Sequence, residues 1–252
     1  TPTLLEKYLA AAKKVVAAVY SDPALKKKVL FKTPDDEITP KEAAKQALTY
    51  HATRAYRRRV SDEDLAPLHN AFAKGRQAGK SYEQSLRAPL TALLINPRFL
   101  FRAEHDESGK DEWPLNDFEI ATRLSYFLWS SMPDRELFKL ADKGKLRDPK
   151  ILREQTLRMI ASPKFSALSR HFAGRWLEFD KMIDHADPDP KRFPTFTPEL
   201  RRSMYYESVE FFTHLIRKNR PLTELIDSDY TFANSTLARP YRLKEALTGS
   251  EL

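Results

Sequence analysis

Residues 116 to 146, NDFEIATRLSYFLWSSMPDRELFKLADKGKL, hold the densest group of aromatic residues in the chain, set between two helix signals. Asn116 and Glu119 have the spacing of a capping box, in which two side chains satisfy free amides at the first turn of a helix. Apolar residues then recur with the period of an α-helix and predict one buried face. That face consists of Ile120, Leu124, Phe127 and Leu128.

Pro133 predicts a sharp corner after this helix. A proline disfavours helical geometry at the residue before it, here Met132, and it suits the first turn of a following helix. Asp134 and Glu136 favour the positive end of that second helix. The stretch therefore predicts two helices that meet at an angle and bury an apolar face.

The same signals recur along the whole chain and predict an all-α protein of about nine helices, packed in orthogonal and bundle-like fashion in two regions. We expect an N-terminal helix and linker in residues 1–37, a helical domain in 38–108 and a second helical domain in 109–252. The polar connection at residues 105–111 marks the boundary between these domains. Residues that cap or open the other helices are Thr39, Ser61, Ser81, Asp148, Pro163 and Thr197.

Composition excludes several kinds of chemistry within these 252 residues. With 41% hydrophobic and 31% charged residues, the chain has the composition of a globular protein. The absence of cysteine rules out disulfides, thiolate metal sites, a cysteine nucleophile and covalent haem attachment in this chain. The six glycines never cluster, so neither a phosphate-binding loop nor a dinucleotide fingerprint is present.

The net charge of +8 lies entirely in the first part of the chain. Residues 1–105 carry 19 Lys and Arg against 11 Asp and Glu, whereas the remainder carries 24 of each. Arg57, Arg58 and Arg59 lie in this part, directly before an acidic helix start, which predicts solvated local ion pairs. An alternative is nucleic-acid binding through this basic N-terminal part.

One helix carries candidate metal ligands. Glu207, Glu210 and His214 are spaced i, i+3 and i+7, which places two carboxylates and an imidazole on a narrow arc of the helix that begins at Thr197. Such groups can ligate a divalent metal in a helical bundle, as a metal-dependent enzyme would require. The simpler interpretation is a polar flank beside an apolar helix face.

A loop and two arginines also carry polar groups that could bind a ligand. The loop around Asp184, His185, Asp187 and Asp189 offers oxygen and imidazole ligands, but it lacks the pattern of a calcium loop. Arg123 and Arg175 lie in apolar helices, and a partly buried arginine needs a carboxylate or carbonyl partner. For these two arginines we expect a structural ion pair, with Glu178 or Glu207 as partner, before a substrate-binding role.

Several motifs resemble one family. ATRLSYFLWSSMPDRELFKLADKGKL (121–146), HFAGRWL (171–177), DPKRFP (189–194), ESVEFF (207–212) and DYTFAN (229–234) resemble, in this order, the domain of unknown function fifteen-ninety-two. Upstream, RAYRRRVSDEDLAPL (54–68) and INPRFLFRAE (95–104) are similar to the companion domain fifteen-ninety-five. Both occur in large planctomycete proteins and some other bacteria, often beside a c-type cytochrome module.

This resemblance implies a binding or scaffolding module of a large exported multidomain protein. Its expected partners are neighbouring domains of the same polypeptide, including a c-type cytochrome module, and any haem would lie on that neighbour. A divalent metal is the cofactor that the alternative enzyme hypothesis would add, through Glu207, Glu210 and His214. Export, periplasmic or cell-surface, is implied by the resemblance alone.

Overall fold

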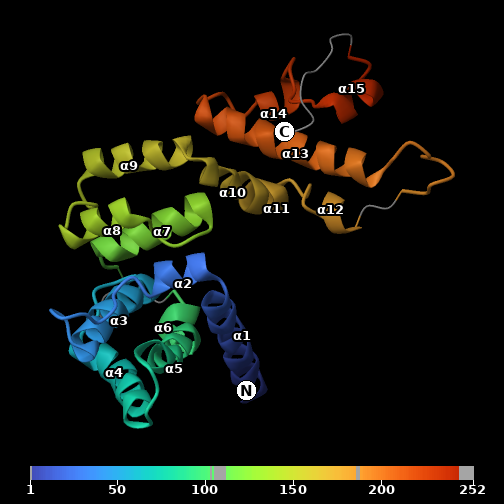
Figure 1. Cartoon of the computed structure of the whole chain (residues 1–252). Coiled ribbons are helices and arrows are strands. Elements are labelled where there is room, and N and C mark those ends of the chain that lie inside the picture. The colour runs from blue at the N-terminus through green and yellow to red at the C-terminus, as the bar shows by residue number, and fades with distance from the viewer. Residues whose placement is uncertain (1, 103, 105–111, 186–187, 244–252) are drawn as a thin grey trace. The chain divides into compact units, whose positions relative to one another are not determined.

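The computed structural model describes residues 2–102, 104, 112–185 and 188–243, and the regular structure in these ranges is helical, without strands (Figure 1). The predicted all-α class is therefore confirmed. The chain divides into two compact units, Thr1–Glu119 and Ile120–Leu252. The predicted connection at residues 105–111 lies outside the described residues. None of the described helices combines the length and the apolar character that crossing a bilayer requires.

Residues 2–102 of the first unit contain six helices. Their bounds are α1 Pro2–Ser21, α2 Pro23–Val29, α3 Pro40–Tyr56, α4 Asp62–Gln77, α5 Tyr82–Ile95 and α6 Pro97–Leu100. Helices α3, α4 and α5 start at the predicted side-chain caps, whereas α2 lies in the predicted linker. Thr39 accepts a hydrogen bond from the Glu42 amide, and Ser61 and Ser81 each form a capping box. These motifs satisfy amides that would otherwise lack a partner.

An apolar core holds the helices of this unit together. Helices α4 and α5 approach each other closely where Gly75 faces Ser85, since a Cβ at Gly75 would lie 3.0 Å from the Cβ of Ser85. Tyr20, near the end of α1, donates a hydrogen bond to the Glu83 carbonyl in α5. The most deeply buried side chains of the core are Ala43, Ala44, Leu48, Ala52, Leu68 and Leu86.

Arg57, the first residue of the arginine run, is buried and used internally. It ends α3 in the left-handed conformation, with φ of 55°. Its Nη2 donates to the carbonyl oxygens of Arg98 at 2.8 Å and Phe101 at 2.7 Å. Carbonyls at the end of a helix lack intrahelical partners. The guanidinium therefore joins the end of α3 to the chain at α6.

Asp64 confirms the predicted local charge pairing, but the prediction of solvated pairs is wrong, because this carboxylate is only 5% exposed. It accepts two hydrogen bonds from Arg58, at 2.8 and 3.0 Å, and forms a second ion pair with Arg98. Burial raises the pKa of the Asp64 carboxyl. Hydrogen bonds from Arg58 and the Ser61 amide, and the charges of both arginines, outweigh burial and lower this pKa below 3.8.

The boundary between the two units falls within α7. The second unit contains most of α7 and the rest of the chain. The amides of Phe118 and Glu119 donate to Asn116 Oδ1, and the Asn116 amide donates to Glu119, so the predicted cap is confirmed. The bounds are α7 Asp117–Trp129, α8 Arg135–Asp142, α9 Pro149–Ala161, α12 Lys181–His185, α13 Pro198–Arg217, α14 Glu224–Asp227 and α15 Ser235–Tyr241.

The predicted corner after α7 is present, with a small shift. Pro133 was expected in the first turn, but Asp134 is the N-cap, so Pro133 lies before the helix. Asp134 accepts a hydrogen bond from the Leu137 amide. The same carboxylate binds Arg158 of α9 at 2.7 Å. Trp129 is buried and donates from its indole nitrogen to the Met159 carbonyl at 3.0 Å. These contacts fix the corner against α9.

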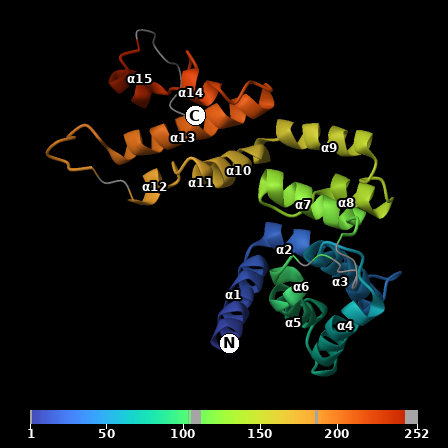
Figure 2. The ribbon, with the colours of Figure 1, turned by 180° about the vertical axis from the view of Figure 1, so that it is seen from behind.

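The helix that Pro163 was predicted to open is not uniform in its hydrogen bonding. It is divided into a 3-10 turn, a π-helical turn and two short α-helical pieces, and it lies alongside α13 in both views (Figures 1 and 2). In the π-helical turn the Gly174 amide donates to the Ser169 carbonyl, five residues back. The bounds are η1 Pro163–Phe165, α10 Ser166–Leu168, η2 Ser169–Ala173 and α11 Gly174–Trp176.

A pair of buried hydroxyls joins this segment to α13. Ser169 Oγ and Thr213 Oγ1 lie 2.6 Å apart, and Thr213 also donates to the Val209 carbonyl at 2.8 Å. A hydroxyl has one proton to donate. Because the proton of Thr213 goes to Val209, Ser169 must donate to Thr213.

Replacement of Asp64 tests the buried ion pairs of the first unit. We expect D64N to lower the free energy of unfolding by about 1–2 kcal/mol at neutral pH, measured by chemical denaturation. The effect is modest because Arg58 and Arg98, whose side chains are 42% and 53% exposed, can be hydrated instead. Since the folded pKa is depressed, this stabilisation is present above about pH 3.8 and is lost as the pH falls through the folded pKa.

Asp62 provides the matched control. It is exposed and lies in the same first turn of α4, so D62N makes the same change in charge near the helix start without touching the buried pairs. We expect D62N to change the free energy of unfolding by less than about 0.5 kcal/mol. Equal effects of both substitutions would show that the helix dipole, and not the buried pairing, is responsible.

Candidate functional site

The helical segment 166–176 presents two different sets of side chains. Phe172 and Trp176 are one helical turn apart, and His171 and Arg175 form a second pair with the same spacing. Ser169 and Ala173, which are buried, hold the segment in place against the rest of the second unit. Both outward sets are therefore positioned by the same buried contacts.

The first set forms an aromatic patch, which we define as Phe127, Phe172 and Trp176. Their rings form a connected row, with centroid distances of 6.5 Å from Phe127 to Phe172 and 5.9 Å from Phe172 to Trp176. These side chains are 59%, 49% and 54% exposed, and the buried Phe212 lies beneath Phe172. The prediction that Phe127 belongs to a buried face is therefore wrong, although its neighbour Leu128 is buried.

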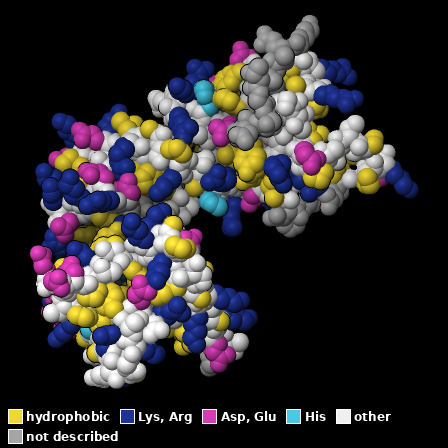
Figure 3. Space-filling model, viewed as in Figure 1, with side chains coloured by type: hydrophobic (Ala, Val, Ile, Leu, Met, Phe, Trp, Pro, Cys, Tyr) yellow, Lys and Arg dark blue, Asp and Glu magenta, His cyan; other side chains and the backbone are white. Residues whose placement is uncertain are grey.

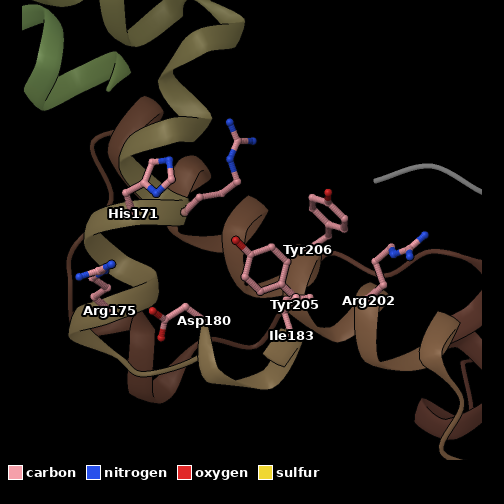
Figure 4. Close-up of a pocket in the computed structure, with 8 residues that line it drawn as sticks. His171, Arg175, Asp180, Ile183, Arg202, Tyr205 and Tyr206 are labelled. Atoms are coloured by element: carbon pink, nitrogen blue, oxygen red, sulfur yellow. The ribbon is translucent and has the colours of Figure 1, made fainter. Parts of the chain in front are cut away.

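The second set lines a hollow between the segment 166–176 and α13, with a volume of about 370 Å³. In Figure 4, His171 and Arg175 lie on one wall, and residues of α13 lie across from them. Asp180 also lines this hollow. We call it the arginine hollow, after the arginines among its lining residues Arg170, His171, Arg175, Arg202, Tyr205 and Tyr206.

A tight chain reversal places Asp180 in the arginine hollow. Glu178 has φ of 62°, and the Asp180 amide donates to the Gly174 carbonyl at 3.3 Å. A Cβ built on Gly174 would lie 3.4 Å from Asp180 and from Phe179 of the reversed chain, which is an ordinary van der Waals distance.

The environment of Tyr205 keeps its phenol protonated. Burial raises the pKa of Tyr205, the charge of Arg170 opposes this shift, and Tyr206 and Asp180 add to it. The phenol is therefore a hydrogen-bond donor at neutral pH. On the same side, Arg170 Nη1 donates to Ser166 Oγ at 2.9 Å, and this bond orients the guanidinium while leaving most of its donors for other groups.

Of the predicted metal ligands, Glu207 binds two hydroxyl groups of the chain itself, those of Thr231 and Tyr241. His214 lies against the ring of Phe232, with centroids 5.0 Å apart, and Glu210 is half-buried on the same helix. Among the described residues, no three His, Cys, Asp or Glu side chains form a group that could hold a metal ion. The metal site stays a prediction.

Hydrogen bonding to Glu207 also changes Tyr241. Burial, together with the hydrogen bond to Glu207 and the charge of Glu207, raises the pKa of the Tyr241 phenol from 10.0 to about 12. The carboxylate therefore connects α13 to α15 through a phenol that remains protonated. This is a structural use of Glu207 that its helical spacing did not indicate.

The structure does not bring the two predicted arginines to one site. Arg123 is exposed on α7, whereas Arg175 lines the arginine hollow. Of their predicted partners, Glu207 is bound as described above, and Glu178 forms an ion pair with Lys181 at 2.7 Å.

In the proposed cation loop, the side chains of Asp184 and His185, and residues 186–187, lie outside the described part of the chain. Asp189 accepts a hydrogen bond from the Lys191 amide at 2.9 Å, which is a turn-forming contact.

The aromatic patch and the arginine hollow were both missed in the sequence. The two i, i+4 pairs in HFAGRWL were a usable signal, because they separate aromatic from basic side chains on one segment. What the spacing could not supply is the position of Phe127, which comes from α7, and of Arg202, which comes from α13.

Comparison with known proteins gives the family. The family model described as PSD4, Protein of unknown function (DUF1592), matches residues 115–243, and the one described as PSD5, Protein of unknown function (DUF1595), matches residues 43–104. No curated protein and no solved structure matches the chain. Since the first match covers just over half of the chain and contains both the aromatic patch and the arginine hollow, the chain belongs to the PSD4 family, Protein of unknown function (DUF1592).

Proposed function

We propose that this chain is a helical binding module that docks through its aromatic patch onto a neighbouring domain of the same polypeptide. The exposure of Phe127, Phe172 and Trp176 as one connected row carries this proposal. Aromatic residues dominate the binding energy of protein interfaces, because they bury a large area with few rotatable bonds. The ring contacts already order these side chains, so docking costs less conformational entropy.

The partner that we propose is a c-type cytochrome module, in a large exported protein. The support is the family resemblance, in which the two domains stand beside such modules, together with the composition of the chain. Without cysteine, these residues cannot attach a c-type haem, so a haem of that kind would have to lie on a neighbour. The role of the chain is then to hold the haem-carrying domain in place within the larger protein.

The proposed docking is tested with the haem-loaded cytochrome module of the same reading frame, titrated into the chain by calorimetry. We expect W176S to weaken binding about 30-fold, because loss of an aromatic interface anchor costs about 2 kcal/mol. F127S is expected to weaken binding as well. A reading frame that encodes no signal peptide and no Cys-x-x-Cys-His motif would contradict the proposed partner and its export.

Phe193 supplies the control for this experiment. Its side chain is 55% exposed in the same unit but lies in the loop before α13, away from the aromatic patch. We expect F193S to bind the cytochrome module as the unchanged chain does. Equal losses for F193S and W176S would show that any exposed aromatic residue is enough, and the patch would then have no special role.

The alternative of a metal-dependent enzyme has its own test. If Glu207, Glu210 and His214 ligate a metal, elemental analysis after dialysis without chelator must find near-stoichiometric iron, zinc or manganese, and E210A and H214A must abolish it. Because Glu207 binds Thr231 and Tyr241, we expect the analysis to find little metal. We expect E207Q to act on Tyr241 instead. Removing the carboxylate charge should move the pKa of Tyr241 from about 12 toward 10.0, measured by NMR titration.

Nucleic-acid binding through the N-terminal part is the weaker alternative, and the arrangement of its charges gives it no support. Arg57 is buried and bound to carbonyl oxygens, and Arg58 is paired with Asp64. On the face shown in Figure 3, Lys and Arg side chains are scattered among acidic and apolar ones. A nucleic-acid surface gathers its basic residues on one face.

A further inference from the structure

The arginine hollow concentrates positive charge that the described part of the chain leaves unbalanced. Arg170, Arg175 and Arg202 line it against a single carboxylate, that of Asp180. Among the described residues, none of these three arginines forms a salt bridge, although Arg58, Arg98, Arg158 and Arg220 all do. Like charges gathered around one concave surface repel each other, and an anion placed between them removes that repulsion.

The arginines approach the hollow from two walls. Arg170 and Arg175 belong to the segment 166–176, and Arg202 belongs to α13. Figure 4 shows Arg175 and Arg202 at opposite ends of the group, with the ring of Tyr205 between them. A guanidinium binds carboxylate and phosphate with two parallel hydrogen bonds. An anion with charged groups at both ends would therefore be bound from both walls.

Tyrosine and histidine side chains, with the apolar Ile183, complete the lining. Tyr205 and Tyr206 lie next to each other on α13, with ring centroids 5.3 Å apart. Their hydroxyl groups can donate to an anion, and their rings provide an apolar surface for the carbon atoms of an organic ligand. His171, on the opposite wall, adds an imidazole N–H that can donate to the same ligand.

A second hollow, at the other end of α13, also contains an arginine, but there the arginine charge is balanced by a carboxylate of the chain. It is lined by Arg220, Lys218, His214 and Tyr230, with a volume of about 580 Å³. Here the guanidinium of Arg220 binds Glu224 at 2.6 Å, and Tyr230 donates to the same carboxylate. The chain thus supplies its own anion at that hollow, whereas Asp180, the carboxylate that lines the arginine hollow, forms no salt bridge with any of its three arginines among the described residues.

We propose that the arginine hollow binds a small organic anion that carries more than one carboxylate or phosphate group. A volume of about 370 Å³ is at the small end of the range for ligand pockets, which suits a compact polyanion and not a polymer. The ligand is bridged between Arg175 on one wall and Arg202 on the other, with Arg170 and the tyrosine hydroxyls contacting it in between.

The experiment is a calorimetric titration of the full chain with citrate and, separately, with pyrophosphate, at constant ionic strength set by potassium chloride. Citrate tests a carboxylate ligand, and pyrophosphate tests a phosphate ligand. We expect one binding event with at least one of these probes, and the preferred probe assigns the ligand class. Binding of neither probe would overturn the proposal.

Substitutions on the two walls test the bridging arrangement. R175Q and R202Q change exposed arginines that form no salt bridge with described residues, so folding should be preserved and thermal unfolding can confirm it. Each should weaken binding of the preferred probe at least about tenfold. R153Q, which removes an exposed arginine on α9 outside the hollow, should leave the affinity unchanged. A loss in R153Q as large as in the other two would show attraction to net charge alone and overturn the proposal.

The anion site and the docking surface can be tested independently. Trp176 belongs to the aromatic patch and does not line the arginine hollow. W176S should therefore lose affinity for the cytochrome module and keep its affinity for the anion probe, while R175Q should weaken only anion binding relative to the unchanged chain. A proposal that fails in its own assay fails without affecting the other.

Discussion

The hydrogen bond from Ser169 to Thr213 is the contact on which both candidate sites depend. The two side chains are buried, and the Thr213 hydroxyl donates a hydrogen bond to the Val209 carbonyl. Both hydroxyl protons therefore have an acceptor. A buried hydroxyl without a partner costs about 1–3 kcal/mol. If the segment 166–176 slid along α13 by one residue, the pair would be broken and that cost incurred. The bond therefore fixes the register in which the aromatic and basic side chains are presented.

Two opposite kinds of surface follow from this register. The π-helical turn adds a residue to the helical repeat, so that Arg170 and His171 reach the hollow while Phe172 contacts Phe127 of α7. Apolar rings prefer to be covered by a protein surface, and guanidinium groups prefer a hydrogen-bonded anion. The same short segment can therefore serve a domain interface and a small ligand without either occupying the place of the other.

Local signals in the sequence were sufficient for the starts of the longer helices, missed short ones such as α2, and were insufficient for the sites. Thr39, Ser61 and Asn116 cap helices at the predicted positions. Such caps can be predicted from the sequence because each involves only residues within one helical turn. Phe127 was predicted to be buried and is exposed, and Asp64 was predicted to be solvated and is buried. Both outcomes are decided by segments that are distant in the sequence. Hydrophobic periodicity gives the faces of a helix, but the number of neighbours that cover a face is a tertiary property.

The motifs that carry the family resemblance meet one another in space, and this separates structural from functional residues. Glu207 of ESVEFF binds Thr231 of DYTFAN, and Asp64 of RAYRRRVSDEDLAPL binds Arg98 of INPRFLFRAE, so these polar side chains are used within the fold. HFAGRWL differs, because His171, Phe172, Arg175 and Trp176 are all exposed. Exposed aromatic side chains contribute less to the free energy of folding than buried ones do. Arginines in a hollow that form no salt bridge with a described residue repel one another. Residues of this kind are consistent with the two proposed binding roles, in which the motif acts together with Phe127 of α7 and Arg202 of α13.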